Sequence, residues 1–445
     1  MIIIDEAVKN VLSKMNQAGI EAYLVGGYIR DLLLKKKSFD IDICFRGSLD
    51  ELAEIFQDCN LDLSAQQFHS LSFSIGDFKF ECSHFRKESE YENHRHPSKI
   101  ELVNTLQEDL IRRDFTINSI AFSLEDGLVD TFGGMGDLQD KVLKTIKNAQ
   151  ATFKEDYLRI FRAYRFKSQL GFTFDDASKE ALISLLPLTY DYPVQWWQVE
   201  FEKMIMGQHF LSMALEEGDL LKSLFPIFIE AYDWDQRNPY HLYSLYEHTM
   251  RVVAHVPYDI RLRYAALFHD CGKLTTEVHD DKGISHYPGH AEASYEYAKD
   301  ELQRFQMKKK DRDYILKLIR YHGVRMPVGI DTVYKMAVEH GSEFLQDLIL
   351  LKKADNISKS EKGHYQIIKC DQFMLDLEQI IAEAWPLRVK DLQVKGDDCI
   401  ALGVEKKNIS KVLTQVLNTV VARQVGNDLE NQYSILKEVI SNVIY

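Results

Sequence analysis

No apolar run in the sequence approaches the ~20 residues needed to span a bilayer, and the short apolar stretch at its N-terminus follows no basic region. We therefore expect neither membrane insertion nor secretion. The six cysteines show neither CxxC nor finger-like spacing, so the sequence predicts no disulfide framework and no zinc ribbon. Such cysteines favour a cytoplasmic protein with reduced thiols, and this is the location we expect.

An excess of positive charge is also lacking, because the formal net charge is −14 at pH 7. A chain of this sign is not expected to coat nucleic acid non-specifically, since binding to polyphosphates rests largely on lysine and arginine. We expect no DNA partner, and any RNA partner must meet local basic patches. With nine prolines and 22 glycines in 445 residues, the whole length is expected to fold, into roughly two to four domains.

The spacing of apolar residues changes from mixed α/β to helical near residue 137. Before that point, segments with helical spacing and segments with strand-like alternation follow one another, and residues 71–85 indicate a hairpin. After it, helical spacing continues to the end, with breaks at Pro187, Pro193, 233–240 and 386–397. The sequence thus predicts an α/β domain followed by helical domains.

Two carboxylates lie on a predicted strand, FDIDICF. Asp40 and Asp42 are two residues apart, so both point to one face, whereas Ile41 and Ile43 can enter the core. Such carboxylates repel unless a cation lies between them, and oxygen ligands suit Mg²⁺, which also bridges nucleotide phosphates. The pair indicates metal-assisted phosphoryl transfer, although an exposed strand with acidic outward positions gives the same pattern.

A glycine pair precedes these carboxylates at a predicted strand-to-helix turn. In LVGGYIRDLLL, Gly26 and Gly27 let backbone amides approach a triphosphate, and Arg30 adds charge from the first helical turn. A lone glycine pair more often marks a tight turn without a ligand. Together with DIDI, however, this segment resembles the opening signature of class II tRNA nucleotidyltransferases and the related bacterial poly(A) polymerases.

This resemblance implies an α/β nucleotidyltransferase head of the polymerase beta-like type. It places a third catalytic carboxylate at Glu81, in FKFECSHF, beside Asp40 and Asp42. The expected reaction is attack of an RNA 3′-hydroxyl on the α-phosphate of a nucleoside triphosphate, assisted by Mg²⁺ held at Asp40 and Asp42. No protein nucleophile is required.

The segment QEDLIRRDFTINSIAF resembles the RRDxxxN motif of the same family. The resemblance implies that Arg113 meets phosphate and that Asp114 and Asn118 meet the ribose. The pattern also suits an amphipathic helix with a charged face. On a helix, however, Asp114 and Asn118 lie one turn apart and share a face, which favours a joint role in recognising the sugar.

The segment KEDYLRIFRAYR resembles the family's EDxxR motif. The resemblance implies that Asp156 and Arg159 hydrogen-bond to the incoming base in place of a nucleic-acid template. Arg162 and Arg165 continue the arginine spacing of three and are included in the predicted nucleotide site. An ordinary surface helix rich in salt bridges has a similar composition.

Two segments depart from the family pattern. RKESEYENHRHPSKIE resembles the flexible loop that complete CCA-adding enzymes have and CC-only enzymes lack, so it implies addition of A. The family loop carries an acidic residue and paired arginines where this chain has Asn93 and Arg95-His96, which leaves an A-adding specialist open. In QWWQVEFEKMIMG, Trp197 and Gln198 stand in a stretch where the family has an arginine, and the role of this motif stays open.

A second constellation lies in the helical region. His248, His269, Asp270 and Asp355 follow the order H…HD…D, which resembles the HD superfamily of metal-dependent phosphohydrolases. Such ligands suit a divalent transition metal, and His290 with His322 would permit a second ion. A lone buried histidine is usually a satisfied core residue, but an adjacent His-Asp with partners in this order is harder to attribute to packing. The resemblance implies a phosphatase or cyclic phosphodiesterase that trims RNA 3′ ends.

The last segment resembles the C-terminal end of Gram-positive-type CCA-adding enzymes. Lys406 and Lys407 replace a Gly-Pro of the family at a predicted helix start, where they could meet a tRNA phosphate. A solvated surface turn explains them equally well.

The resemblance covers most of the chain and predicts a template-independent enzyme that adds CCA to tRNA from CTP and ATP. The same-fold alternatives are an A-adding specialist and a poly(A) polymerase, although a poly(A) polymerase usually has a strongly basic extension, which this acidic chain lacks. The cross-class alternative is an HD phosphohydrolase whose head only binds RNA. The predicted domains are a head (1–140), a helical neck and body (141–235), an HD domain (236–360) and a helical tail (361–445).

Overall fold

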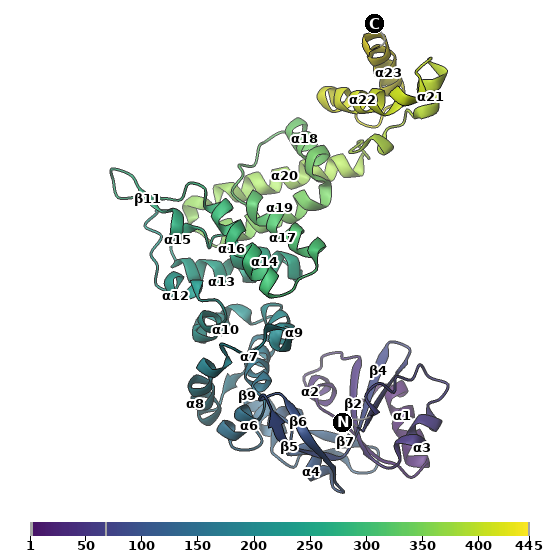
Figure 1. The fold of residues 1–445 in the computed structure, drawn as a ribbon, viewed down its shortest axis with the longest axis vertical. Coiled ribbons are helices and arrows are strands. Elements are labelled where there is room, and N and C mark those ends of the chain that lie inside the picture. The colour runs from purple at the N-terminus through teal and green to yellow at the C-terminus, as the bar shows by residue number, and fades with distance from the viewer. Residues whose placement is uncertain (1–2, 67–68, 444–445) are drawn as a thin grey trace. The chain divides into compact units, whose positions relative to one another are not determined.

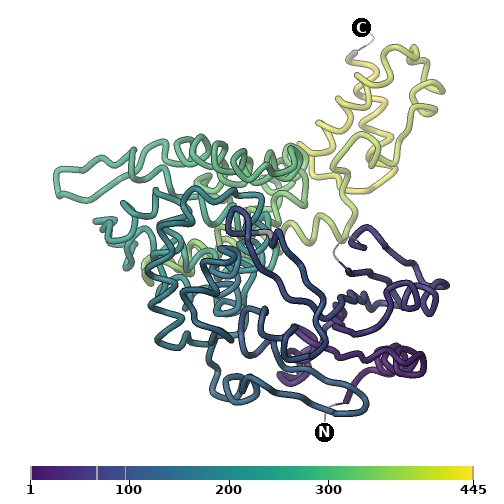
Figure 2. The backbone as a smooth tube through the Cα atoms, turned by 60° about the horizontal axis from the view of Figure 1, so that its bottom comes forward, coloured from purple at the N-terminus to yellow at the C-terminus, as the bar shows by residue number. Residues whose placement is uncertain are grey.

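A computed structural model describes residues 3–66 and 69–443, and the chain divides into two compact units, Met1–Leu224 and Phe225–Tyr445. Figure 1 shows the elements of both units, and Figure 2 traces the backbone in a second view.

The first unit is built on a six-stranded mixed sheet. Its strand order is β3-β4-β2-β1-β7-β8, so the catalytic candidates of β2 lie on a central strand. Strand β1 runs antiparallel to β2, and β4 runs parallel to it. The strands are β1 (Glu21–Val25), β2 (Asp40–Arg46), β3 (Ser70–Ile75), β4 (Phe78–His84), β7 (Ala121–Ser123) and β8 (Gly127–Val129).

The two faces of this sheet have opposite character along β2. Ile41 and Ile43 are each 1% exposed and lie in the core, whereas Asp40 and Asp42 lie on the other face. Asp42 pairs in register with Glu81 of β4, so the two carboxylates project to the same side. The alternation in the sequence therefore predicted the face of each residue correctly.

Helices and small sheets complete the first unit. A separate two-stranded sheet follows β4 and consists of β5 (Arg86–Glu92) and β6 (His96–Leu102). Short strands β9 (Val142–Leu143) and β10 (Thr173–Phe174) pair in parallel. The helices are α1 (Glu6–Gln17), α2 (Gly27–Leu33), α3 (Leu49–Ile55), α4 (Leu106–Leu110), α5 (Gly134–Asp140), α6 (Ala149–Glu155), α7 (Leu158–Leu170), α8 (Asp176–Leu185), α9 (Val194–Ile205), α10 (Phe210–Glu216) and α11 (Gly218–Leu224).

The second unit is a helical array with one small hairpin, formed by β11 (Val278–His279) and β12 (Ser285–His286). Several helices start at side-chain caps, such as Ser244 before α13, which accepts a hydrogen bond from the backbone of Glu247. The helices are α12 (Ile227–Ala231), α13 (Leu245–His255), α14 (Ile260–Phe268), α15 (Lys273–Thr276), α16 (His290–Arg304), α17 (Lys309–Tyr321), α18 (Ile330–His340), α19 (Ser342–Ile357), α20 (Tyr365–Ala382), α21 (Gly396–Ala401), α22 (Ile409–Arg423) and α23 (Leu429–Val443).

Two local predictions differ from the structure. The segment that resembles a flexible loop forms the β5–β6 hairpin, in which Arg86 pairs in register with Leu102. The RRDxxxN segment is not one α-helix, because α4 ends at Leu110 and a 3-10 turn, Thr116–Asn118, follows. The argument that Asp114 and Asn118 share a helix face was therefore wrong, although the two side chains do meet.

Candidate functional sites

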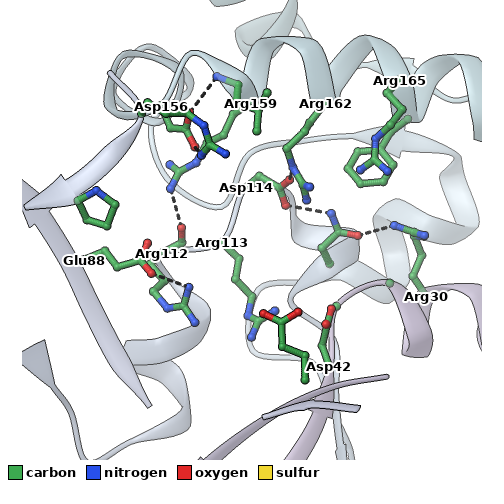
Figure 3. Close-up of a pocket in the computed structure, with 18 of the residues that line it drawn as sticks. Arg30, Asp42, Glu88, Arg112, Arg113, Asp114, Asp156, Arg159, Arg162 and Arg165 are labelled. Atoms are coloured by element: carbon green, nitrogen blue, oxygen red, sulfur yellow. Dashed lines mark hydrogen bonds and ion pairs between the residues drawn. The ribbon is translucent and has the colours of Figure 1, made fainter. Parts of the chain in front are cut away.

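One cavity of about 1030 Å³ in the first unit brings together every residue that the sequence predicted for catalysis or nucleotide binding. Figure 3 shows how side chains from the sheet, the turn after α4 and α7 converge on it. The predicted residues that line it are Gly26, Gly27, Arg30, Asp40, Asp42, Glu81, Arg113, Asp114, Asn118, Asp156, Arg159, Arg162 and Arg165.

Gly26 lies against the catalytic candidates at the turn from β1 to α2. Its φ of +72° and ψ of −140° suit glycine, and a Cβ there would lie 2.7 Å from Asp42 Oδ2 and 3.5 Å from Arg113 Nη1. Burial raises the pKa of Asp42, and nearby Arg113 opposes this shift. The turn thus requires glycine for both its backbone conformation and its closeness to Asp42.

A buried polar network joins the RRDxxxN residues to α7. Asn118 Nδ2 donates to Asp114 Oδ1 at 2.9 Å, and Arg30 Nη1 donates to Asn118 Oδ1 at 2.8 Å. Arg162 Nε donates to the second oxygen of Asp114 at 2.6 Å. Burial alone would raise the pKa of Asp114, but Arg162 and Asn118 outweigh it and hold that pKa well below its ordinary value. Asp114 is therefore a fixed, charged acceptor in the cavity wall.

The EDxxR residues lie at the junction of α6 and α7, where they contact the β5–β6 hairpin. Asp156 follows the last residue of α6, and its Oδ2 lies 3.4 Å from Arg95 Nη1. Burial raises the pKa of Asp156. The His94 ring stacks on Tyr157, with centroids 4.3 Å apart and an interplanar angle of 9°. The hairpin tip is thus docked on the segment that the resemblance assigns to base selection.

Arg159 is 6% exposed and its terminal nitrogens are engaged. Nη1 donates to the Thr152 carbonyl at 3.1 Å and to Glu155 Oε2 at 3.0 Å. Nη2 donates to the Arg112 carbonyl at 2.9 Å and to the Tyr91 hydroxyl at 3.2 Å. An incoming base can therefore pair with Nη2 only by replacing one of these oxygens.

Sequence reasoning missed several residues that organise this cavity. Asp109, which is fully buried, accepts from Arg112 at 2.8 Å and from Arg113 at 3.2 Å, and so orients both arginines. Glu88 on β5 accepts from Arg112 at 3.1 Å. The acidic Asp109 three and four residues before two arginines was a usable signal, whereas Glu88 lay in a segment taken for a loop.

The motif whose role was left open supports α7 from α9. Trp197 is 2% exposed and its ring stacks on Phe161, with centroids 5.3 Å apart and an interplanar angle of 2°. Glu200 Oε2 lies 2.6 Å from Arg165 Nε. Burial and the neighbouring Arg162 lower the pKa of Arg165 to about 10, despite Glu200. In the described structure, Trp197 serves packing and Glu200 holds an arginine of the cavity.

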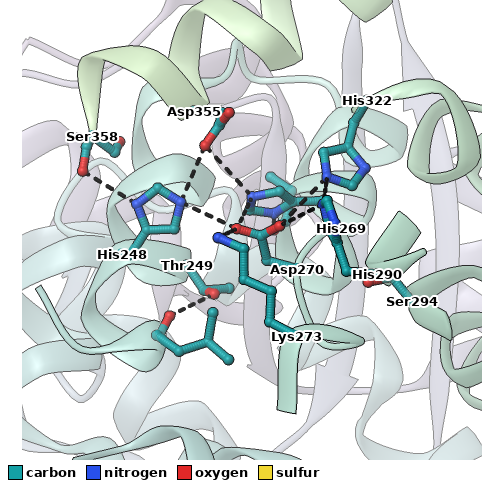
Figure 4. Close-up of polar contacts among 12 residues, drawn as sticks. His248, Thr249, His269, Asp270, Lys273, His290, Ser294, His322, Asp355 and Ser358 are labelled. Atoms are coloured by element: carbon teal, nitrogen blue, oxygen red, sulfur yellow. Dashed lines mark hydrogen bonds and ion pairs between the residues drawn. The ribbon is translucent and has the colours of Figure 1, made fainter. Parts of the chain in front are cut away.

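The second unit brings the predicted HD residues into two adjoining clusters that share Asp270 (Figure 4). In the first cluster, His248 Nε2 lies 3.2 Å from Asp355 Oδ1, and His269 Nε2 lies 3.2 Å from Asp270 Oδ2. His248 Nε2, His269 Nε2 and Asp355 Oδ1 are buried and have no hydrogen-bond partner among the described residues. Such orphaned donor atoms fit a divalent transition metal.

The second cluster consists of Asp270, His290 and His322. His290 Nε2 and His322 Nε2 lie 3.6 Å and 3.4 Å from Asp270 Oδ1, so the two oxygens of Asp270 face different clusters. Burial lowers the pKa of His322 to about 4. The arrangement is that of a carboxylate able to bridge two ions.

Backbone carbonyls fix the orientation of all four HD histidines. The Nδ1 atoms lie 2.6 to 3.2 Å from carbonyl oxygens, which can only accept, so each Nδ1 carries the proton and each Nε2 faces the clusters, where those of His290 and His322 lie 3.1 Å apart. The four pairs are His248 with Ser358, His269 with Ala266, His290 with Tyr287 and His322 with Ile319. The tautomers are therefore set for metal binding.

A cavity of about 410 Å³ opens onto these clusters, and cations line it. Lys273 Nζ lies 2.6 Å from Asp270 Oδ2, and Lys359 Nζ lies 2.6 Å from Asp355 Oδ2. Arg325 and Lys352 also line the cavity. This charge suits a phosphate group next to the metal ligands.

The tail lysines lie at the surface. Lys406 and Lys407 belong to a 3-10 turn, Lys406–Asn408, directly before α22, and Lys407 Nζ pairs with Glu405 at 2.7 Å. Their role in binding RNA stays a prediction. Among the described residues, no helix has both the length and the apolar character needed to cross a bilayer.

Comparison with protein-family models matches residues 22–144 to the Poly A polymerase head domain and residues 240–360 to the HD domain. The CCA-adding enzyme of Geobacillus sp. (strain WCH70) is 39% identical over 211 residues, which are 47% of this chain and 52% of that protein. The CCA-adding enzyme of Leuconostoc citreum (strain KM20) is 39% identical over 227 residues, which are 50% of this chain and 55% of that protein. The matched part thus spans about half the length of these curated relatives.

Solved structures extend the likeness in fold to nearly the whole chain. The crystal structure of Bacillus stearothermophilus CCA-adding enzyme in complex with CTP has a TM-score of 0.66 at 20% identity and covers 98% of each chain. The Thermotoga maritima CCA-adding enzyme complexed with tRNA_CCA has a TM-score of 0.57 at 20% identity and covers 99% of this chain and 96% of that one. The predicted fold class, a polymerase beta-like head followed by a helical body, is confirmed.

Proposed function

We propose that this chain adds CCA to the 3′ end of tRNA from CTP and ATP, because its residues 22–144 match the Poly A polymerase head domain and its residues 240–360 match the HD domain. The observation that carries this proposal is that one cavity brings three sets of side chains together. They are the strand carboxylates Asp40, Asp42 and Glu81, the buried carboxylate Asp114, and the pair Asp156 and Arg159. Each of these groups matches one part of a nucleoside triphosphate.

The carboxylates would hold Mg²⁺, which would stabilise charge on the transferring phosphoryl group. Asp40, Asp42 and Glu81 suit this ion because they offer only oxygen and share one face of the sheet. Arg113, oriented by Asp109, lies beside Asp42 and is placed to contact the triphosphate.

The remaining polar groups of the cavity would select the nucleotide. Asp114 and Asn118 supply a charged acceptor and an amide for the ribose hydroxyls. Asp156 and Arg159 supply an acceptor and a donor for the base edge. In this proposal, Asp156 and Arg159 at the start of α7 select the base in place of a nucleic-acid template.

Stepwise extension of defined tRNAs tests the head. The protein is incubated with tRNAs that end before CCA, after C and after CC, with CTP, ATP or both. We expect completion of CCA on all three, and Asp42→Ala should abolish it. Addition to the CC-ended tRNA alone would identify an A-adding specialist, and an unlimited A tail would identify a poly(A) polymerase.

We also propose that the HD clusters form a phosphohydrolase centre that removes 2′,3′-cyclic or 3′ phosphates from RNA ends. The orphaned Nε2 atoms, the bridging position of Asp270 and the cationic cavity support this second activity. His248, His269, Asp270 and Asp355 would hold one transition-metal ion, and Asp270 with His290 and His322 a second. The ions would activate water and stabilise charge on the phosphate.

Metal content and hydrolysis test the HD proposal together. His269→Ala and Asp270→Ala should lose bound metal, measured by elemental analysis, and release of phosphate from 2′,3′-cyclic nucleotides. CCA addition by these variants should persist. Unchanged metal content and turnover in both variants would refute the proposal.

A further inference from the structure

We propose that Tyr91 is a specificity-determining residue of the base site, because its hydroxyl occupies the position on Arg159 that an acceptor atom of the incoming base must take. The proposal rests on the proposed nucleotidyl transfer and deepens it. Tyr91 lies on β5 and lines the same cavity as Asp156 and Arg159.

Tyr91 is the most replaceable of the four oxygens bonded to Arg159. Two of the others, of Thr152 and Arg112, are main-chain carbonyls, and the third belongs to Glu155, which also pairs with Lys147 at 2.8 Å. The Tyr91 hydroxyl reaches Arg159 Nη2 at 3.2 Å from the separate β5–β6 hairpin. A base can take over this hydrogen bond without breaking the junction between α6 and α7.

The surroundings of Tyr91 fix its hydroxyl as an acceptor toward Arg159. The hydroxyl donates its proton to Glu88 Oε2 at 3.2 Å, so its lone pairs are available to the guanidinium. Glu88 is held in turn by Arg86 at 2.8 Å and by Arg112 at 3.1 Å. An acceptor of fixed direction therefore faces Arg159.

The β5–β6 hairpin also places a hydrogen-bond donor, Arg95, beside Asp156, the other residue proposed to contact the base. Arg95 Nη1 lies 3.4 Å from Asp156 Oδ2. Arg95 thus offers a donor to Asp156, and Tyr91 offers an acceptor to Arg159. The pairing edges of cytosine and adenine carry the same two functions in their amino group and the adjacent ring nitrogen. Uracil in the same orientation presents an N–H where cytosine has its acceptor, so there it does not replace the Tyr91 oxygen on Arg159.

Removal of the Tyr91 hydroxyl should therefore strengthen the binding of CTP and ATP but not of UTP. In Tyr91→Phe, Arg159 Nη2 lacks one acceptor while the site is empty, and a buried donor without a partner is costly. Cytosine or adenine restores the missing hydrogen bond on binding, whereas uracil does not. We expect the Kd of CTP and of ATP to fall by about tenfold, a factor that corresponds to ~1.4 kcal/mol, with no gain for UTP.

Calorimetric titration of the full-length protein with CTP, ATP and UTP in the presence of Mg²⁺ tests this expectation. Tyr190→Phe is the matched control, because Tyr190 is 64% exposed and its hydroxyl should not influence nucleotide binding. Tyr91→Leu is a second variant without the hydroxyl, and thermal melting checks that each variant is folded. Both Tyr91 variants should bind CTP and ATP more tightly than the wild type does.

Equal or weaker CTP binding in both folded Tyr91 variants, or a gain for UTP equal to that for CTP, would overturn the proposal. The wild-type protein separates this result from failure of the proposed function. If the wild type binds CTP and extends tRNA, only the role of Tyr91 is refuted. If the wild type does neither, the nucleotidyltransferase proposal and the role of Tyr91 fail together.

Discussion

Replacement of Gly26 by alanine would place a new atom close to Asp42 in the cavity where we propose catalysis. The new Cβ would lie 2.7 Å from Asp42 Oδ2, so the carboxylate must retreat by about 0.7 Å to restore an ordinary contact of 3.4 Å. A displacement of about 1 Å at a reacting group can cost about 10²-fold in rate. We expect Gly26→Ala to lower kcat by between about tenfold and 10²-fold.

The same substitution also strains the backbone. At φ +72° and ψ −140°, an alanine costs about 1–3 kcal/mol, which lowers the free energy of unfolding. Gly133→Ala is the control, because Gly133 has φ +75° and nothing lies within 4 Å of the position of its Cβ. Gly133→Ala should destabilise the protein without loss of kcat.

Steady-state addition of AMP to a CC-ended tRNA, together with chemical unfolding, separates the two effects of Gly26→Ala. We expect reduced kcat at a temperature where the variant is fully folded. If folded Gly26→Ala retains the wild-type kcat, then the closeness of Gly26 to Asp42 does not position the carboxylate, and the reasoning is refuted.

Three further predictions concern charged groups. Because the pKa of Asp114 is depressed, its ion pair stabilises the fold above the unfolded pKa of about 3.9, and this contribution is lost as the pH falls. In urea unfolding, Asp114→Asn should therefore lose less stability on acidification than the wild type does. Glu200→Gln leaves the largely covered Arg165 without its ion pair and should lower the free energy of unfolding by ~3–5 kcal/mol. Glu438→Gln, in an exposed ion pair, should have little effect in the same assay. His322→Ala should lower the number of bound transition-metal ions from two to one, measured by elemental analysis, and loss of both ions or of neither would contradict the two-cluster arrangement.

The sequence predicted best those features that depend on short-range alternation. The acidic and apolar faces of β2 follow from a period of two, and the structure has Asp40 and Asp42 opposite Ile41 and Ile43. The hairpin predicted over 71–85 is formed by β3 and β4. The structure also brings the predicted nucleotide residues into one cavity, although their roles stay predictions.

Features that depend on tertiary contacts could not be read from the sequence. The polar run after β4 has no strong apolar alternation, yet it pairs as β5 and β6, and its tip packs on Tyr157 through His94. Asp114 meets Asn118 through a turn, not through a continuous helix, because α4 ends at Leu110. Residue spacing alone did not distinguish these conformations.

The net charge of the chain and the charge of its cavity have opposite signs, and this contrast bears on which partners can enter. Nine cationic and six acidic side chains line the cavity of the first unit, whereas the whole chain carries a formal charge of −14. Many of the arginines are fixed by buried carboxylates, as Arg113 is by Asp109 and Arg162 is by Asp114. A fixed local excess of cations attracts a triphosphate to this cavity, while the acidic remainder of the chain repels nucleic acid elsewhere. If the proposed reaction takes place there, charge favours an RNA end at the cavity over an RNA strand along the surface.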